Sequence, residues 1–240
     1  MNSILLDPLQ AAAAMASSLL ETRSLKVDFH THILPREVPD FKEQFGYEGG
    51  WVTFDHDQSK VDTKGNCRMM KDGEFFREIE PNCWSLEHRV VDMDRDGIDV
   101  HVLCTVPVMF SYWAKPADTC VVAQFLNDDL ARTVAENPTR FIGLGTLPMN
   151  SPEGAVLEMQ RCVRELGFRG VQIGSHVNDW NLDAPELLPF WEEAERLQCV
   201  VFGEFYFSYH MTEYSTNIRT NNNDLLFSPR SFQSTLGTWS

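Results

Sequence analysis

The sequence predicts an α/β fold, an incomplete barrel of the TIM (β/α)8 type with about five strands. Strand-like and helix-like segments alternate from Val27 to Phe202, which favours parallel strands joined by right-handed helical crossovers. Capping residues, glycines and prolines mark the ends of the helical segments. About five strands and four helices fit into this stretch, whereas a complete eight-stranded barrel needs about 250 residues.

The first predicted strand, 27–32, is followed by a long glycine- and charge-rich excursion that reaches about residue 83. The first helix is expected over 86–96. Ser85 suits its N-cap, and Gly97 suits the left-handed position where a helix ends. The second strand is expected over 99–104.

The next helix is expected over 117–136, because Asn137-Pro138 would stop it. The strand 141–147 follows. Ser151-Pro152 then opens a helix that ends at Gly167. Its buried stripe is expected to consist of Val156, Met159, Cys162, Val163 and Leu166.

The fourth strand is expected over 170–173 and the fifth over 199–202. Between them, Asp183 and Glu186 resemble a capping box, with Asp183 as the N-cap of a helix that runs through Leu197. We therefore expect three regions: an N-terminal extension over 1–26 that is disordered or loosely helical, a barrel portion over 27–202, and a disordered tail over 203–240.

Composition excludes several classes of function. The formal net charge is −15, which argues against a nucleic-acid partner because phosphate backbones require clustered cations. No apolar run approaches the roughly 18 residues of a membrane span. The cysteines at positions 67, 83, 104, 120, 162 and 199 show no metal-binding spacing, so we expect reduced thiols in a cytosolic protein.

A metal site is predicted at the end of the first strand. Side chains two residues apart on a strand share a face, so His30 and His32 can reach one ion through neutral imidazole nitrogens. Asp28 falls on the same face. The motif also lies at the end of the first strand of a barrel-like array, and barrel enzymes have their active sites at the C-terminal ends of the strands. An exposed strand face that alternates polar residues is the alternative interpretation.

Sequence motifs along most of the chain resemble the aminocarboxymuconate-semialdehyde decarboxylases, a zinc-dependent family of the amidohydrolase superfamily. The resemblance begins with Val-Asp-Phe-His-Thr-His-Ile-Leu-Pro at 27–35. It continues through Phe-Gly-Tyr at 45–47, Gly-Gly-Trp at 49–51, Lys-Asp-Gly at 71–73, Asn-Cys-Trp at 82–84, the run 105–116, Gly-Leu-Gly-Thr-Leu-Pro at 143–148 and Gly-Val-Gln-Ile-Gly at 170–174.

The resemblance implies zinc-dependent, non-hydrolytic decarboxylation of a small anionic semialdehyde in the kynurenine route of tryptophan breakdown, which diverts flux from quinolinate toward picolinate. It also implies a cytosolic homodimer. His30 and His32 would be zinc ligands, and Arg77 would bind a substrate carboxylate. Arginine suits that role because its rigid fork pairs bidentately with carboxylates. A solvated surface charge is the alternative for Arg77.

The chain departs from the family pattern after Phe202. The resemblance implies a third ligand histidine near 204, a proton-handling histidine and a late aspartate ligand. The sequence has Glu204 at that place. Glu204 can offer an oxygen to zinc, but it lacks the family's surrounding motif, so we expect nothing in 203–240 to replace these groups. The tail is therefore expected to be translated intron sequence, and the chain to be inactive alone. The alternative is a non-catalytic truncated product that misfolds or pairs with full-length subunits.

Overall fold

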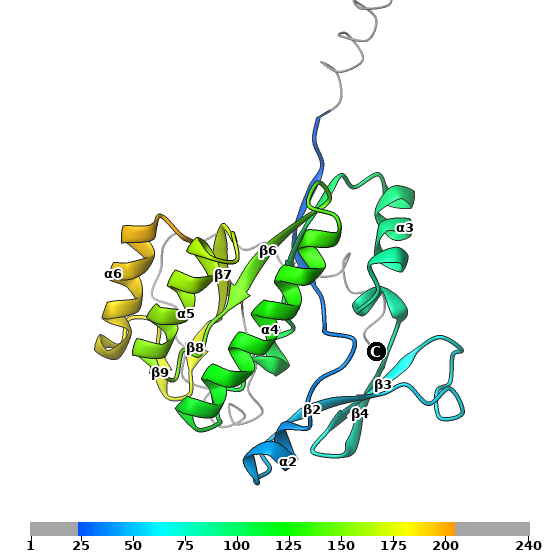
Figure 1. The fold of residues 1–240 in the computed structure, drawn as a ribbon, viewed down its shortest axis with the longest axis horizontal. Coiled ribbons are helices and arrows are strands. Elements are labelled where there is room, and N and C mark those ends of the chain that lie inside the picture. Colours follow the sequence, from blue (N-terminus) through cyan, green and yellow to red (C-terminus); the bar gives the residue numbers. More distant parts are fainter. Residues whose placement is uncertain (1–23, 205–240) are drawn as a thin grey trace, which may run out of the picture. The chain divides into compact units, whose positions relative to one another are not determined.

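A computed structural model describes residues 24–204 (Figure 1). The predictions for residues 1–23 and 205–240, which include most of the expected extension and tail, lie outside the described residues. Within the described part, no helix is long and apolar enough to cross a membrane. All six cysteines are free thiols; Cys67, Cys104 and Cys162 are buried, and the other three are partly buried.

Five parallel strands form the main sheet, in the order β1-β5-β6-β7-β10. They are β1 (Val27–His32), β5 (Val100–Cys104), β6 (Phe141–Thr146), β7 (Gly170–Gly174) and β10 (Val200–Glu204). The helices between them are α3 (Leu86–Asp96), α4 (Pro116–Glu136), α5 (Pro152–Arg164) and α6 (Leu188–Leu197). The predicted alternation of strands and helices is confirmed.

Helices α4, α5 and α6 lie side by side against one face of this sheet (Figure 1). The main core fills the space between them and includes Leu103, Phe141, Met159, Ile173 and Phe190. On the opposite face, Val102, Cys104 and Leu144 form a smaller cluster with Phe202. We call this second side the inner face.

The sheet is curled toward its inner face. β1 and β10 are its two edges, separated by three strands. Even so, the rings of Phe29 and Phe202 on these edge strands lie 5.6 Å apart, centroid to centroid. The sheet is therefore a half-barrel, which confirms the predicted incomplete barrel.

The excursion after β1 is more ordered than its composition indicates. It contains α2 (Phe41–Phe45) and a three-stranded antiparallel sheet of β2 (Val52–Asp55), β3 (Cys67–Lys71) and β4 (Glu74–Ile79). This sheet has its own buried residues, which include Trp51, Cys67 and Met69. A short 3-10 helix, Pro81–Cys83, then leads into α3.

Two caps behave as predicted and one does not. Ser85 accepts a hydrogen bond from the His88 N–H, and Gly97 is left-handed, with φ 67°. Asp183 does not cap a helix, because a 3-10 turn over Pro185–Leu187 precedes α6. Ala184 takes the extended conformation that a following proline favours, which leaves Asp183 one residue too early to cap the turn.

The remaining elements are short. A two-stranded ribbon of β8 (His176–Val177) and β9 (Trp180–Asn181) follows β7. A 3-10 turn over Pro107–Met109 follows β5.

The pairing of β7 with β10 requires a glycine at position 170. Gly170 pairs with Val200, and a methyl group at position 170 would lie 2.4 Å from the Val200 carbonyl oxygen. Gly170→Ala is expected to lower the free energy of unfolding by about 1–3 kcal/mol, because backbone must move. Urea unfolding would measure this. Gly203→Ala is the matched control, since a methyl group there meets nothing within 4 Å; equal stability of the two variants would contradict the prediction.

Candidate metal centre

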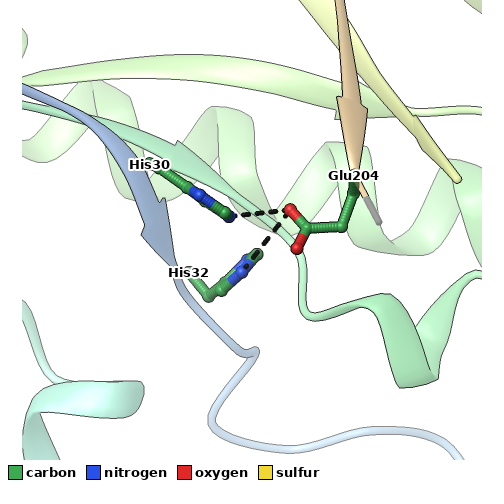
Figure 2. A group of neighbouring side chains, drawn as sticks. All are labelled: His30, His32 and Glu204. Carbon is green, nitrogen blue, oxygen red and sulfur yellow. Dashed lines mark ion pairs between the residues drawn. The ribbon is translucent and has the colours of Figure 1, made fainter. Parts of the chain in front are cut away.

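Two imidazoles and one carboxylate meet on the inner face (Figure 2). His30 and His32 come from β1, and Glu204 comes from the end of β10. Glu204 Oε2 lies 2.7 Å from His30 Nε2 and 3.8 Å from His32 Nε2. One ligand atom from each residue lies within 4.8 Å of the others. These separations suit ligands bound to one ion at about 2.0–2.2 Å, with a small widening at His30.

The two edge strands create this meeting point. The carboxyl ends of barrel strands face the same end of the barrel, and the curl of the sheet brings the ends of β1 and β10 toward each other. The register of β1 against β5 shifts between Asp28 and Thr31. Such irregularities re-aim side chains near functional sites. Thr31 anchors the strand beyond the shift by donating to the Val102 carbonyl at 2.9 Å.

His32 is held in a tautomer that suits metal binding. Its Nδ1 lies 2.9 Å from the Thr105 carbonyl oxygen. A carbonyl can only accept, so Nδ1 carries the proton and Nε2 of the neutral ring keeps a free lone pair toward Glu204. This outer hydrogen bond is typical of metal-ligating histidines. Burial also lowers the pKa of His32, which favours the neutral ring that a metal requires.

Glu204 is charged despite its burial. Burial opposes its ionisation and the hydrogen bond with His30 favours it, and the net effect is a lowered pKa. The same hydrogen bond raises the pKa of His30, although burial opposes this shift. In addition, Gln172 Nε2 donates to Glu204 Oε2 at 3.1 Å. The cluster therefore combines an anionic oxygen ligand with two nitrogen ligands, a donor set that zinc accepts.

The backbone of β1 is supported from α3. Arg89 is buried, and its guanidinium donates to the carbonyl of His32 and, at 2.8 Å, to that of Asn82. Burial lowers the pKa of Arg89, but a guanidinium stays protonated in proteins. The arginine thus fixes the end of β1 from which the candidate ligand His32 projects.

The structure places one residue of 203–240, Glu204, beside the two histidines. The sequence pattern predicts that the fifth strand ends at Phe202, whereas β10 continues to Glu204. Phe202 and Glu204 are two residues apart, so both side chains face inward. Glu204 is the residue that completes the cluster with His30 and His32.

The other two residues singled out in the sequence, Asp28 and Arg77, are not part of this cluster. Asp28 accepts a hydrogen bond from the backbone N–H of His30 at 3.2 Å. Arg77 is exposed on β4, and its guanidinium lies 5.7 Å from the centre of the Phe76 ring. The role of Arg77 in binding substrate remains a prediction.

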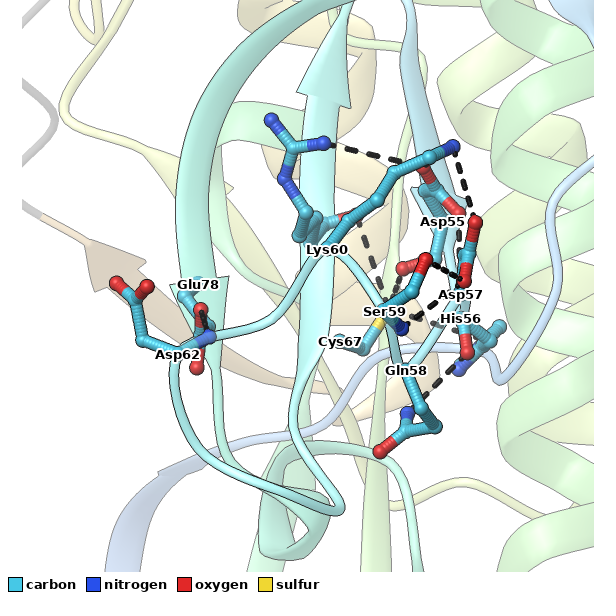
Figure 3. A network of polar contacts seen from close by, with 10 residues as sticks. Asp55, His56, Asp57, Gln58, Ser59, Lys60, Asp62, Cys67 and Glu78 are labelled. Carbon is cyan, nitrogen blue, oxygen red and sulfur yellow. Dashed lines mark hydrogen bonds and ion pairs between the residues drawn. The ribbon is translucent and has the colours of Figure 1, made fainter.

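A second group of acidic residues lies in and beside the loop between β2 and β3 (Figure 3). Asp55 pairs with Lys60 at 2.9 Å, and Asp57 accepts a hydrogen bond from the Ser59 hydroxyl at 2.7 Å. Glu78 accepts from the backbone N–H groups of Asp62 and Thr63. These carboxylates hold the loop together. Within residues 24–204, the His30–His32–Glu204 cluster alone has the geometry of a metal site.

Residues 27–213 match the family model described as Amidohydrolase, so the chain belongs to the amidohydrolase family. A curated relative, 2-amino-3-carboxymuconate-6-semialdehyde decarboxylase of Dictyostelium discoideum, is 54% identical over 180 residues, which cover 75% of this chain and 48% of the relative. The Caenorhabditis elegans protein of the same name is 41% identical over 215 residues, covering 80% and 52%. The chain thus spans about half the length of these relatives.

A solved structure supports the fold. It is a dihydroxybenzoic acid decarboxylase from Polaromonas with bound manganese and the inhibitor 2-nitroresorcinol. Its TM-score is 0.56 at 25% sequence identity, and the match covers 77% of this chain and 50% of that chain. The half-barrel described above therefore corresponds to about half of an amidohydrolase-family structure.

Proposed function

We propose that this chain carries the metal centre of a decarboxylase that acts on 2-amino-3-carboxymuconate 6-semialdehyde. The observation that carries the proposal is the convergence of His30, His32 and Glu204, with His32 Nε2 left free by the bond from Nδ1 to Thr105. The names and identities of the two curated relatives support the choice of reaction and substrate.

We further propose zinc as the ion. Two imidazoles with one carboxylate form a known catalytic zinc set, which leaves a position open for water or substrate. Bound there, the ion would supply Lewis-acid activation of water and of substrate oxygens. The manganese in the Polaromonas structure makes manganese the obvious ion for comparison.

The substrate carries carboxylates, and a chain of net charge −15 repels anions overall. A local cation is therefore needed to bind it. We propose Arg77 for this role, because the residue is exposed on β4 and a guanidinium can pair bidentately with a carboxylate. A cytosolic location, a homodimeric assembly and a place in the kynurenine route are proposed on the resemblance to the decarboxylase family.

A second candidate function is a non-catalytic chain that pairs with a longer subunit. It is favoured by apolar side chains left exposed on the sheet, since Phe29, Ile142 and Val200 are 47%, 37% and 48% exposed. It is also favoured by the small number of candidate ligands. The described residues bring together three of them, without the further carboxylate that the family pattern implies.

The activity assay compares residues 1–240 with a chain in which the C-terminal half of the Dictyostelium relative follows Phe202. We expect no carbon dioxide release from residues 1–240 and turnover by the completed chain, because the family's other ligand and proton-handling groups lie in that half. Comparable rates would contradict the expected inactivity. A completed chain that folds and holds zinc without turnover would contradict the decarboxylase proposal and leave the non-catalytic one.

A further inference from the structure

We propose that Gln172 is a positioning residue that fixes the Glu204 carboxylate as a metal ligand. The inference rests on the proposed metal function. It assigns to Gln172 one task, which is to hold the orientation of a ligand that belongs to the opposite edge of the sheet from the two histidines.

Gln172 is placed for this task by the sheet. It lies in the middle of β7, it is completely buried, and its register partner on β10 is Phe202. Side chains two residues apart share a face, so Gln172 and Glu204 both point to the inner side. Gln172 Nε2 donates to Glu204 Oε2 at 3.1 Å. This is the oxygen that lies closest to the two imidazoles.

The other end of the same amide makes no hydrogen bond within residues 24–204 that would account for the residue. In the part of the chain that the structure describes, Gln172 Oε1 is buried and has no hydrogen-bond partner. Leaving a buried acceptor unpaired is costly, and an apolar side chain of the same shape would avoid the cost. Unsatisfied groups of this kind require an explanation, and a functional site is one. The hydrogen bond from Nε2 to Glu204 therefore explains why an amide occupies this position.

The chemistry of the pair suits a metal ligand. A carboxylate oxygen has more than one lone pair, so Glu204 Oε2 can accept from Gln172 and still bind an ion. A neutral amide orients the carboxylate without competing with the ion as a second cation would. Such outer hydrogen bonds to ligating carboxylates typically change metal affinity by about 10–100-fold.

The test is a double-variant cycle on residues 1–240, with zinc affinity measured by competition against a chromophoric chelator. Gln172→Met keeps the size of the side chain and removes the donor. We expect it to weaken zinc binding by about 10–100-fold. In a Glu204→Ala background the same substitution should change zinc affinity by less than about 2-fold, because a residue that acts through Glu204 has nothing left to position.

Asn150→Leu is the matched control. Asn150 also has a buried, unpartnered oxygen, and its amide donates to the Tyr112 and Ala114 carbonyls at 2.9 Å. It should lower the melting temperature of the metal-free chain and leave zinc affinity unchanged.

Three results would overturn the role of Gln172. They are unchanged affinity in Gln172→Met, an equal loss with and without Glu204, and failure of both Gln172→Met and Gln172→Leu to fold while Asn150→Leu folds. If the unsubstituted chain binds no zinc, the proposed metal function itself fails, which is a different outcome.

Discussion

The His30→Ala/His32→Ala double variant is expected to lose divalent-metal affinity by more than about 100-fold, because loss of one outer-shell partner alone typically costs 10–100-fold. The double substitution removes two of the three candidate ligands that the described residues supply. Binding to the unsubstituted chain is itself expected to be weak, since fewer ligands surround the ion than the family pattern implies. Metal content after mild dialysis would measure the loss.

His56→Ala/His88→Ala is the control for this experiment. His56 contacts the Arg36 carbonyl at 2.8 Å, and His88 contacts the Ser85 hydroxyl at 2.9 Å. Neither histidine belongs to the cluster, so this variant should retain zinc as the unsubstituted chain does. Near-stoichiometric zinc in the His30→Ala/His32→Ala variant would show that the ion binds elsewhere.

Arg77→Ala should reduce kcat/KM of the completed chain. The loss should correspond to about 2–5 kcal/mol of transition-state stabilisation, because a desolvated contact with a substrate carboxylate is removed. Steady-state kinetics on the semialdehyde would measure the effect. Stability should change little, because Arg77 is exposed on β4.

Arg68→Ala is the matched control for Arg77. Arg68 lies on the neighbouring strand β3 and contacts Asp55 at 4.0 Å and the Phe75 ring at 4.7 Å. Its loss should affect the small sheet more than catalysis. Unchanged kcat/KM in Arg77→Ala, or an equal loss in both variants, would refute the assignment of Arg77.

The sequence predicts the half-barrel well because its signals are local. Ser85 and Gly97 mark the ends of α3 through bonds and backbone angles within one turn. The antiparallel sheet of the excursion is harder to recognise, because its strands are short and charged. One signal could have found it: Asp72-Gly73 between two strand-like segments predicts a tight hairpin, and both residues have positive φ between β3 and β4.

The metal centre is only partly predictable from the sequence. His30 and His32 share one strand, so their spacing is enough to pair them. Glu204 and Gln172 lie on other strands, and only the curl of the sheet brings them to the histidines. If the fifth strand is extended by two residues beyond Phe202, Glu204 falls on the same inward face as Phe202. This pattern could have predicted the position of the carboxylate. No local pattern identifies Gln172.

The assignment of the metal centre is tested most directly by titrating zinc into the metal-free chain and into its Glu204→Gln variant by calorimetry. Glutamine keeps the shape of the side chain and removes its charge. The unsubstituted chain should bind one equivalent of zinc, and the variant should bind it at least about 10-fold more weakly, because carboxylate ligands are better than amides for this ion. Equal affinity would show that Glu204 is not a ligand and would contradict the assignment.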